Sequence, residues 1–493
     1  MKKTVNVSLA RPGTGKTKKA CKVIQAWASI GRRVLFVVPT VQLADQVCKD
    51  LAAMKPVKID YREGQSTINA LNHYLDVGEE LLIVCQHASF QKCDIRFLHK
   101  WTVVIDELPM PVTLQPTTVR KSQFAVLPFI TKGTDGRLSI EKNCVGKARE
   151  LVRKGVSSQA GIGPAQLLSD DCRKIYNAIL DGLDVYASPD DSNSNCVVYF
   201  SEESGIFERF DNCKEIHILS ATWRGSLFEW FATAHGYKAV RSVLTPDQPD
   251  PHFQRVTIYP MLAADQCSKT VLNGDVELTA EQIRVGATHK RVIQAVTDKV
   301  SEAVGLDQQC LVFVQQWASL GCPENMVIRN MDSRGLNDMT TLSNVLCMFH
   351  GNHITTATNC LKLIAKKYGS SYESLQEAWK RTFLFDATLQ NVYRCSLRNP
   401  TSTVDVALYV QTYEVAEYLV DTFIENAIID MKFIETYRKY KKRGRKSNPK
   451  RDEAISLLER GLSPAQVIEE TGLPDTTVYN YSRELRSRKL KVA

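Results

Sequence analysis

Runs of three to five mostly apolar residues recur through the first 430 residues, and stretches with helical spacing separate several of them. Runs of this length are typical of parallel strands that are buried on both faces of a sheet. The clearest are Val5–Leu9, Val34–Val38, Leu81–Val84, Val103–Ile105, Cys310–Val314 and Val345–Phe349. The pattern therefore predicts buried parallel strands alternating with helices, which is an α/β fold.

The end of the chain has a different pattern, with three short amphipathic helices. The first is predicted for 451–460 and the third for 476–488. Between them, Ser463 supplies an N-cap and Gln466 a capping-box partner, so a short second helix follows and ends at Gly472. The residues expected to face inward on the third helix are Val478, Tyr481 and Leu485.

The length of 493 residues corresponds to about three domains, and 44% hydrophobic with 24% charged residues is ordinary for a globular protein. The net charge of +9 is concentrated at one end. Residues 431–493 contain 16 basic and eight acidic side chains, whereas the residues before them contain 47 and 46. A local basic block indicates either a polyanionic partner or a solvated tail.

The 14 cysteines include no CxxC pair, and no apolar stretch reaches the ~18 residues that a membrane span needs. The N-terminal residues do not have the pattern of a signal peptide. We therefore expect reduced thiols and a cytoplasmic location.

The segment after the first apolar run, A-R-P-G-T-G-K-T, has the composition of a phosphate-binding loop. Its glycines let the backbone fold around phosphate groups, its lysine can reach the β- and γ-phosphates, and its last hydroxyl can hold Mg²⁺. The predicted nucleotide-binding residues are Pro12, Gly13, Thr14, Gly15, Lys16 and Thr17. A flexible turn is the alternative, and the strand and helix predicted on either side argue against it.

Asp106 and Glu107 follow the apolar run Val103–Ile105, at the end of a strand where ligands bind in parallel sheets. Asp106 would bind Mg²⁺ through water, with Thr17, and Glu107 would orient and deprotonate the attacking water. Two acids after a strand also occur as surface caps. Together with the loop, however, they predict hydrolysis of ATP with Mg²⁺.

With these two sites the chain resembles superfamily two helicases and translocases. Pro39–Gln46 is similar to motif Ia, which contacts the nucleic-acid backbone, and Cys85–His87 follows a strand as the next such element does. Ile218–Thr222 matches the S-A-T motif, which implies that Ser220 and Thr222 couple hydrolysis to strand movement. The resemblance implies two RecA-like parallel-sheet domains. The DNA contacts that it implies in the first are Pro39, Thr40 and Gln42.

The second half carries three further resemblances. Cys310–Val314 is placed as motif IV, and Ser333–Asn337 resembles motif V, which implies nucleotide contacts from Gly335 and Asn337. Gln390–Arg398 resembles motif VI, whose arginines reach across the interdomain cleft and are worth about 10³–10⁵ in rate. The catalytic residues that this motif implies are Gln390, Arg394 and Arg398. A surface helix with two arginines is the alternative.

The sequence departs from the family pattern in two places. Arg394 and Arg398 are four residues apart instead of three, and Tyr393 replaces a glycine. A four-residue step predicts both arginines on one helix face. Only 15 residues precede Lys16, which leaves no room for the glutamine motif that recognises adenine in one branch of the family. Recognition of the base is therefore unassigned.

Between Glu107 and Ser220 lie 112 residues, more than a compact domain needs to connect two strands. The part from about 118 to 195 mixes apolar and charged residues at helical spacing, which predicts a mostly helical insertion. Strand separation, partner docking and stability remain open as its role. The predicted domains are RecA-like domain 1, RecA-like domain 2, a basic linker and a DNA-binding domain, at 1–245, 246–430, 431–450 and 451–493.

The three short helices at the end resemble the helix-turn-helix domains of Hin-like recombinases and resolvases, and the basic segment before them resembles their minor-groove arm. The implied DNA contacts are Arg443, Arg445, Thr476, Thr477, Tyr479, Asn480 and Arg483. A solvated linker and a small protein-docking module are the alternatives.

These features predict an ATP-dependent DNA helicase or translocase with single-stranded DNA on its core and duplex DNA on its C-terminal domain. The architecture suits replication or recombination of a phage or mobile element in a bacterial cell. The alternative is a sequence-specific DNA-binding initiator or regulator that uses ATP as a switch without unwinding. A terminase-like packaging motor would need a cluster of nuclease carboxylates, which the sequence before the tail lacks.

Overall fold

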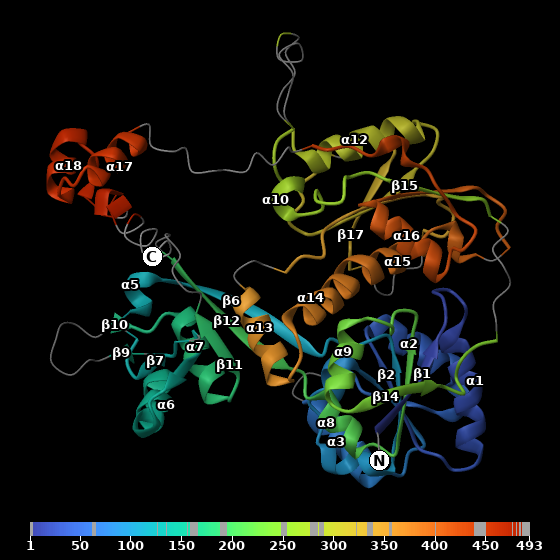
Figure 1. Cartoon of the computed structure of the whole chain (residues 1–493). Helices are drawn as coiled ribbons and strands as arrows, with labels where there is room; N and C mark the ends of the chain where they lie inside the picture. The colour runs from blue at the N-terminus through green and yellow to red at the C-terminus, as the bar shows by residue number, and fades with distance from the viewer. Residues whose placement is uncertain are drawn as a thin grey trace. The chain divides into compact units, whose positions relative to one another are not determined.

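The structure is a computed structural model. It describes residues 3–61, 66–125, 127–134, 136–154, 156–157, 166–187, 195–247, 254–276, 284, 290–321, 323–332, 339–353, 357–399, 401–437, 450–475, 477–479, 481–482 and 485. The chain forms two compact units, Met1–Tyr437 and Arg438–Ala493, which are described separately (Figure 1).

The first domain is built on a seven-stranded parallel sheet with the order β14-β1-β13-β5-β2-β4-β3. Its strands are β1 (Lys3–Leu9), β2 (Val34–Val38), β3 (Val57–Lys58), β4 (Leu82–Gln86), β5 (Thr102–Asp106), β13 (Glu215–Ser220) and β14 (Tyr237–Arg241). All five residues of β2 are buried, as expected for a strand covered on both faces. Because β13 lies between β1 and β5, the ends of these three strands meet at one edge of the sheet.

Helices cover both faces of this sheet (Figure 1). They are α1 (Lys16–Ser29), α2 (Val41–Asp50), α3 (Thr67–Val77), α4 (His87–Phe90), α8 (Ile206–Asn212) and α9 (Leu227–Ala234), with short 3₁₀ turns at Ala52–Met54 and Ile95–Lys100. One core joins α1 and α2 to the sheet through Ile24, Val47 and Phe36. The other joins α8 and α9 through Phe207 and Phe228. The covered faces fix the position of the edge where β1, β5 and β13 end.

The insertion in the first domain is a mixed subdomain with its own core. Strands β6 (Val112–Arg120), β11 (Asp184–Ala187) and β12 (Asn195–Glu203) form an antiparallel sheet. The remaining elements are α5 (Lys121–Phe124), β7 (Ile130–Lys132), β8 (Leu138–Ile140), α6 (Val145–Lys154), β9 (Val156–Ser157), β10 (Gln166–Leu167) and α7 (Asp170–Leu180). The insertion predicted for about 118–195 contains α6 and α7, as expected, and also the short strands β7 to β11, which the apolar spacing did not predict. At its boundaries β6 pairs along its whole length with β12, a partner too distant in sequence for a local pattern to reveal.

The second domain is built on a parallel sheet with the order β17-β16-β18-β19-β15-β20. Its strands are β15 (Val256–Pro260), β16 (Cys310–Val314), β17 (Met326–Asn330), β18 (Asn344–Met348), β19 (Val406–Val410) and β20 (Ile428–Ile429). Its helices are α10 (Lys269–Leu272), α12 (Val292–Val304), α13 (Thr358–Lys367), α14 (Tyr372–Lys380), α15 (Ala387–Val392) and α16 (Tyr413–Thr422), with a π-helical turn at Arg381–Asp386 and 3₁₀ turns at Ser396–Arg398 and Met431–Phe433. Two parallel sheets with flanking helices are the RecA-like architecture that the resemblance implies.

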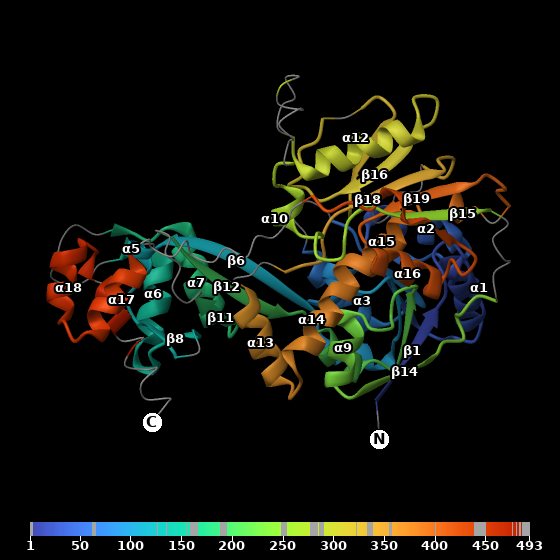
Figure 2. The ribbon, with the colours of Figure 1, turned by 45° about the horizontal axis from the view of Figure 1, so that its top comes forward.

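Helices α13 and α14 leave the second domain and pack against the first (Figure 2). The indole nitrogen of Trp230 on α9 donates to the Ser374 hydroxyl at 3.1 Å, and the Leu227 backbone N–H donates to the Thr382 hydroxyl at 2.7 Å. Apolar side chains from both helices, including Leu361 and Leu375, belong to the core of the first domain. The pair of helices α13 and α14 therefore holds the two parallel sheets on either side of a shared cleft.

The second unit contains α17 (Arg451–Glu459) and α18 (Pro464–Thr471) around a small core. The predicted capping box is present, because the Ser463 hydroxyl accepts from the Gln466 backbone and the Gln466 side chain accepts from the Ser463 backbone. Gly472 ends α18 with a φ of 65°, a conformation that favours glycine. The described residues from 475 to 485 are helical. Ala454, Val467 and Val478 are fully buried between these segments.

Candidate nucleotide-binding site

The phosphate loop runs from the end of β1 to the first turn of α1. Gly13 and Gly15 have φ values of 83° and 74°, which a side chain would strain. The Thr14 hydroxyl donates to the Arg11 carbonyl at 2.9 Å and tightens the loop. Gly15 is also the N-cap of α1, so backbone N–H groups at the start of that helix are available to an anion.

Lys16 lies within this loop. Its ammonium donates to the carbonyls of Ala10 at 2.9 Å and Arg11 at 3.0 Å. Burial lowers the pKa of Lys16 to about 8, although the nearby carboxylates of Asp106 and Glu107 raise it. A cation held over the loop by carbonyl groups can turn toward phosphate oxygens when a nucleotide enters.

Thr17 and Asp106 meet between α1 and the end of β5. The Thr17 hydroxyl donates to Asp106 Oδ2 at 2.7 Å, and Asp106 is only 5% exposed. Burial raises the pKa of Asp106, and the Thr17 hydrogen bond and the Lys16 charge oppose this shift. A hydroxyl and a carboxylate are hard oxygen donors of the kind that Mg²⁺ prefers. The two predicted ligands are thus brought together with suitable chemistry.

Glu107 adopts an unusual backbone conformation directly after β5. Its φ is 63°, which is rare for a residue with a side chain, and its N–H donates to the Leu219 carbonyl of β13 at 2.9 Å. Backbone strain of this kind clusters at functional sites, where neighbouring structure holds it in place. Here the hydrogen bond to β13 fixes the direction of the chain at the edge of the sheet.

Ser220 and Thr222 lie at the end of β13, beside the loop. The Thr222 N–H donates to the Ser220 hydroxyl at 3.0 Å, and the Ser220 carbonyl accepts from the Ala10 N–H at 3.3 Å. Both residues are buried. The predicted coupling segment therefore contacts the phosphate loop through its backbone.

The second domain brings Arg398 to the phosphate loop. A Cβ atom placed on Gly13 would lie 2.9 Å from Arg398 Cγ and 3.3 Å from the Arg398 carbonyl oxygen. Arg394 is 9% exposed. Burial lowers the pKa of both guanidinium groups, and the Glu107 carboxylate raises it. Arg398 from the second domain therefore lies against the loop, and both arginines lie near the Glu107 carboxylate.

The two arginines do not share one helix face, so that prediction was wrong. Helix α15 ends at Val392, Arg394 lies in the following turn, and Arg398 ends the short 3₁₀ turn Ser396–Arg398. The chain turns at Tyr393, whose buried hydroxyl donates to the Phe423 carbonyl at 3.1 Å. Gln390 lies half-buried on α15, and its catalytic role stays a prediction.

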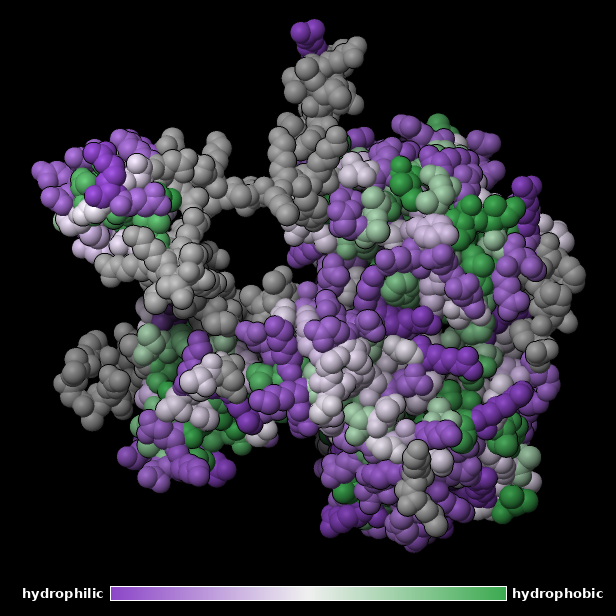
Figure 3. Space-filling view, viewed as in Figure 1, coloured by the Kyte–Doolittle hydropathy of each residue, from purple (hydrophilic) through white to green (hydrophobic). Residues whose placement is uncertain are grey.

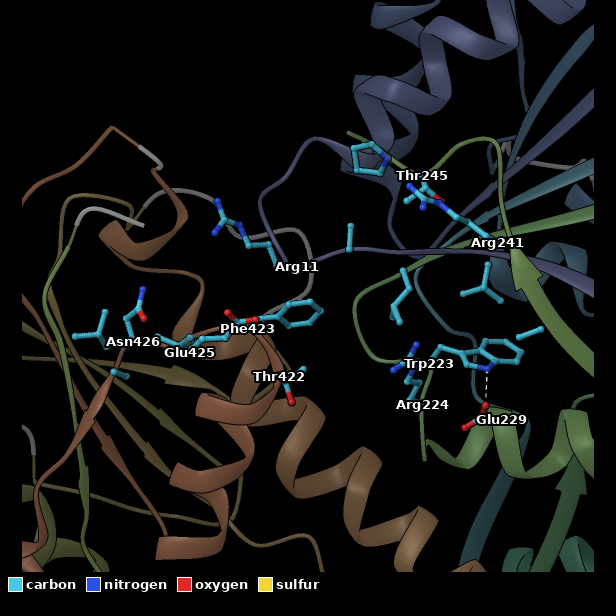
Figure 4. Close-up of a pocket in the computed structure, with 18 of the residues that line it drawn as sticks. Arg11, Trp223, Arg224, Glu229, Arg241, Thr245, Thr422, Phe423, Glu425 and Asn426 are labelled. Carbon is cyan, nitrogen blue, oxygen red and sulfur yellow. Dashed lines mark hydrogen bonds between the residues drawn. The ribbon is translucent and has the colours of Figure 1, made fainter. Parts of the chain in front are cut away.

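A cavity of about 890 Å³ opens between the two domains beside the loop (Figure 4). Its first-domain wall includes Ala10, Arg11 and Arg224, and its second-domain wall includes Gln254 and Phe423. Sequence reasoning missed the second-domain wall because its residues match no motif and come from distant segments. In the sequence, neither the aromatic side chain of Phe423 nor the amide of Gln254 indicates that the two residues line one cavity.

The predicted nucleic-acid contacts in the first domain lie around the start of α2. The Thr40 hydroxyl caps this helix by accepting from the Leu43 N–H at 3.2 Å, Pro39 precedes it, and Gln42 is exposed. In the second unit, Tyr479 is 56% exposed and Thr477 is half-buried. The other assigned residues lie outside the described part of the chain: Gly335, Asn337, Arg443, Arg445, Thr476, Asn480 and Arg483.

The described residues show neither a further metal site nor a membrane-spanning helix. They contain no group of three or more His, Cys, Asp or Glu side chains placed to hold a metal ion. Across the same ranges, no helix is long and apolar enough to cross a membrane. On the face drawn in Figure 3, hydrophobic side chains are scattered among hydrophilic ones.

A comparison with known protein families matches the N-terminal part of the first domain. The family described as type III restriction enzyme, res subunit, matches residues 3–108, which include both the phosphate loop and the carboxylate pair. The match and the geometry of the site are those of an ATP-hydrolysing domain. A comparison with curated protein sequences found no match.

Several solved structures match this chain at low sequence identity and with TM-scores below 0.5. Xpd4 from S. tokodaii is 12% identical over 88% of this chain and 96% of that chain, with a TM-score of 0.48. Dbp5 from S. cerevisiae, bound to RNA and ADP BeF3, is 10% identical over 94% and 90%, with a TM-score of 0.33. UvsW from T4 is 9% identical over 88% and 74%, with a TM-score of 0.24. At these values, fold similarity does not assign a function.

Proposed function

We propose that this chain is an ATP-driven DNA translocase or helicase. The observation that carries the proposal is the contact of Arg398 with the phosphate loop at Gly13, opposite Thr17 and Asp106. A nucleotide bound on the loop would lie between groups from both parallel-sheet domains. Binding and hydrolysis would then change how the two domains are held together, which is what a motor requires.

Each residue of the loop has a chemical task in this proposal. Backbone N–H groups at the start of α1 and the Lys16 ammonium bind the phosphates, because both present positive charge to them. Thr17 and Asp106 would hold Mg²⁺, which neutralises phosphate charge when bound. Gly13 and Gly15 keep the loop open to the phosphates, with Pro12 and Thr14 shaping it.

Hydrolysis is assigned to Glu107 and the two arginines. Glu107 orients a water molecule and takes its proton as the water oxygen attacks the γ-phosphorus and the bond to the ADP oxygen breaks. Arg398 stabilises the charge that develops on the γ-phosphoryl group, and Arg394 supports it. Gln390 is proposed as a further contact of the same motif.

Movement on DNA is assigned to the segments that leave the same sheet edge. Ser220 contacts the loop because its carbonyl accepts from the Ala10 N–H, and the Thr222 N–H donates to the Ser220 hydroxyl, so a change at the phosphates can reach β13. The exposed start of α2, with Thr40 and Gln42, is proposed to contact the backbone of one DNA strand. The prediction that Gly335 and Asn337 contact the nucleotide from the second domain is kept as part of this proposal.

The C-terminal unit is proposed to bind duplex DNA through its last helix and the basic segment before it. Support comes from the concentration of basic residues in 431–493 and from the exposed Tyr479 beside the buried Val478. The DNA contacts predicted from the helix-turn-helix resemblance are retained here. A role in replication or recombination of a phage or mobile element, in a bacterial cytoplasm, completes the proposal.

A sequence-specific initiator or regulator remains the second candidate. The observation that favours it is the separate, capped core of the C-terminal unit, which suits binding at a fixed site. Hydrolysis in a motor is expected to depend on a nucleic-acid track, whereas hydrolysis in a switch would respond mainly to its cognate duplex.

ATPase measurements with a panel of nucleic acids test the proposal. We expect single-stranded DNA to stimulate hydrolysis by the full chain, and Lys16→Ala to abolish it while duplex binding by the C-terminal unit survives. Stimulation by neither single-stranded DNA nor RNA would contradict a motor function. Equal loss of hydrolysis and duplex binding in Lys16→Ala would contradict the separation of the two sites.

A further inference from the structure

One helical run passes from the first domain to the second through a π-helical turn. Helix α14, the turn Arg381–Asp386 and helix α15 follow one another without a break between residues 372 and 392. A π turn inside a helix is rare and is often found at a functional site. Its place in this run, between two α-helices that pack on different domains, indicates what it does.

The two α-helices of this run belong to different cores. Leu375 and Ala378 on α14 are buried in the core of the first domain, beside α9 (Figure 2). Leu389 and Val392 on α15 are buried in the core of the second domain. Buried contacts of this kind are kept when two domains move as bodies, so a change in the angle between them is absorbed by the segment that joins them. In this run, that segment is the π-helical turn.

The first domain holds the turn by one hydrogen bond. The Thr382 hydroxyl on the turn accepts from the Leu227 N–H at 2.7 Å. Leu227 is the first residue of α9, and the N-cap of this helix, Ser226, accepts from the Glu229 N–H. The first N–H groups of a helix have no acceptor within the helix, so the second domain supplies one of the acceptors that α9 needs. The start of α9 is thus capped from both domains.

The second domain holds the same turn by a buried carboxylate. Asp386 is 3% exposed, and its Oδ1 accepts from the Tyr418 hydroxyl at 2.8 Å and from Arg381 Nε at 3.2 Å. The Arg381 guanidinium also lies over the Tyr418 ring, 3.9 Å from its centroid. Tyr418 lies on α16, within the core of the second domain. The end of the turn from which α15 starts is therefore fixed to the second domain.

Both ends of this connection reach the nucleotide site. Leu227 lies seven residues beyond Ser220, whose carbonyl accepts from the Ala10 N–H of the phosphate loop. On the other side, Arg394 lies two residues after the end of α15. A displacement at the phosphate loop can therefore reach the arginines through the hydrogen bond that Thr382 accepts.

We infer that the π-helical turn is a hinge between the two domains, and that Thr382 is a positioning residue that sets the arginine segment against the nucleotide. The inference rests on the proposed function, because it concerns the arginines of the same site. Thr382 acts through α15, so it is expected to change the rate of hydrolysis and to leave the affinity for ATP nearly unchanged.

Substitutions of Thr382 in the full chain test the inference. Thr382→Val keeps the shape of the side chain and removes the acceptor. In steady-state hydrolysis with single-stranded DNA we expect its kcat to fall about threefold to tenfold, because one lost hydrogen bond shifts the population of positioned arginines by such a factor. KM for ATP should stay within about twofold of the wild-type value. Thr382→Ser restores the hydroxyl and should restore kcat.

Ser374→Ala is the matched control. The Ser374 hydroxyl accepts from the Trp230 indole N–H at 3.1 Å, so this variant also loses one hydrogen bond between α9 and the helical run, but on α14. We expect it to keep the wild-type kcat. An equal fall of kcat in Ser374→Ala and Thr382→Val would show that the interface only supports the fold and would overturn the inference.

Amide hydrogen exchange tests the hinge without hydrolysis. The Leu227 N–H has its acceptor on the π-helical turn, so its exchange rate reports that contact. If the contact favours positioned arginines, a nucleotide that engages the arginines must favour the contact, because coupling between two equilibria is reciprocal. We therefore expect a non-hydrolysable ATP analogue to slow exchange at Leu227 in the wild-type chain and not in Thr382→Val. Exchange that the bound analogue leaves unchanged in the wild-type chain would overturn the inference.

The outcomes separate this inference from the proposed function. Hydrolysis stimulated by single-stranded DNA, with kcat unchanged in Thr382→Val, would overturn the hinge and leave the motor intact. Slower exchange at Leu227 with the analogue, in a chain that hydrolyses no nucleotide, would support the hinge and overturn the proposed function.

Discussion

The two sides of the nucleotide cleft are built in different ways. On the first-domain side, the phosphate loop, Thr17, Asp106 and Glu107 all lie at the ends of β1 and β5, whose neighbour β13 fixes their spacing. On the second-domain side, Arg398 and Gln254 approach from turns outside regular helices and strands. The first side is therefore set by one sheet, whereas the second depends on how the two domains are held.

This difference predicts that nucleotide affinity and catalytic rate depend on different residues of the cleft. The loop residues assigned to phosphate binding lie in the first domain, so nucleotide affinity should follow those residues. Catalytic rate should follow Glu107 and the second-domain arginines, because Glu107 acts on the attacking water and the arginines complete the site only when the cleft is closed around the nucleotide. The predictions below vary one side at a time.

The largest effect is expected at Arg398. Arg398→Ala should lower kcat by about 10³-fold or more, because it removes the guanidinium of a residue whose Cγ and backbone lie against Gly13. Arg398→Lys retains the charge without the planar fork and should recover only part of the loss. Arg394→Ala should cost less rate, with its thermal stability measured in parallel since Arg394 is more deeply buried. A larger loss of kcat at Arg394 would reverse their roles.

A slightly smaller effect is expected at Glu107. Glu107→Gln should lower kcat by about 10²–10⁴-fold, because the amide cannot take a proton from water. Affinity for ATP should be retained, as measured by equilibrium titration with a fluorescent nucleotide. A loss of ATP affinity as large as the loss of kcat would show that Glu107 stabilises the phosphate loop and does not act on the attacking water.

Not every feature of this cleft was accessible from the sequence. The residues from Pro12 to Thr17 are contiguous, so their spacing alone predicted the loop that the structure shows. The prediction that Arg394 and Arg398 share a helix face was wrong. The chain turns at Tyr393, whose hydroxyl donates to the carbonyl of Phe423 at the end of α16, and local spacing does not reveal this distant contact. The second-domain wall of the cavity, which includes Gln254, could not be found, since two distant segments enclose the cavity.

The insertion shows the same limit at a larger scale. The helices α6 and α7 were visible from apolar spacing, and the structure contains both. The β6 strand was not, because Pro116 and alternating polar residues make Val112–Arg120 look irregular without its partner. Val112–Arg120 forms a strand because it pairs with β12, and the local sequence pattern does not contain this information.

A moderate pH effect is expected on the first-domain side. The pKa of Lys16 is about 8 in the free protein, so the side chain loses its positive charge as the pH rises through this value. Because that charge binds phosphates, kcat/KM for ATP should fall about tenfold per pH unit above pH 8. The profile of kcat should be flatter, since bound phosphate favours the charged form. Lys18→Met, at an exposed neighbour, should show the same profile, and a constant kcat/KM up to pH 10 would contradict the assignment.

The smallest effect on hydrolysis is expected from removing the basic C-terminal residues. Deletion of 441–493 should leave single-strand-stimulated ATPase activity within about twofold, because both sides of the cleft lie before it. Duplex affinity should fall, and its dependence on salt should become shallower as phosphate contacts are lost. An unchanged affinity and salt dependence would identify the segment as a solvated linker.

Strand displacement by the full chain tests the central claim most directly. A labelled strand annealed next to a single-stranded DNA tail would be followed over time with ATP and with a non-hydrolysable analogue. We predict release of the strand with ATP alone, and none from Lys16→Ala or Arg398→Ala. A protein that hydrolyses ATP and binds the duplex, yet neither releases the strand nor moves a streptavidin block from a DNA end, would contradict a motor and support a switch.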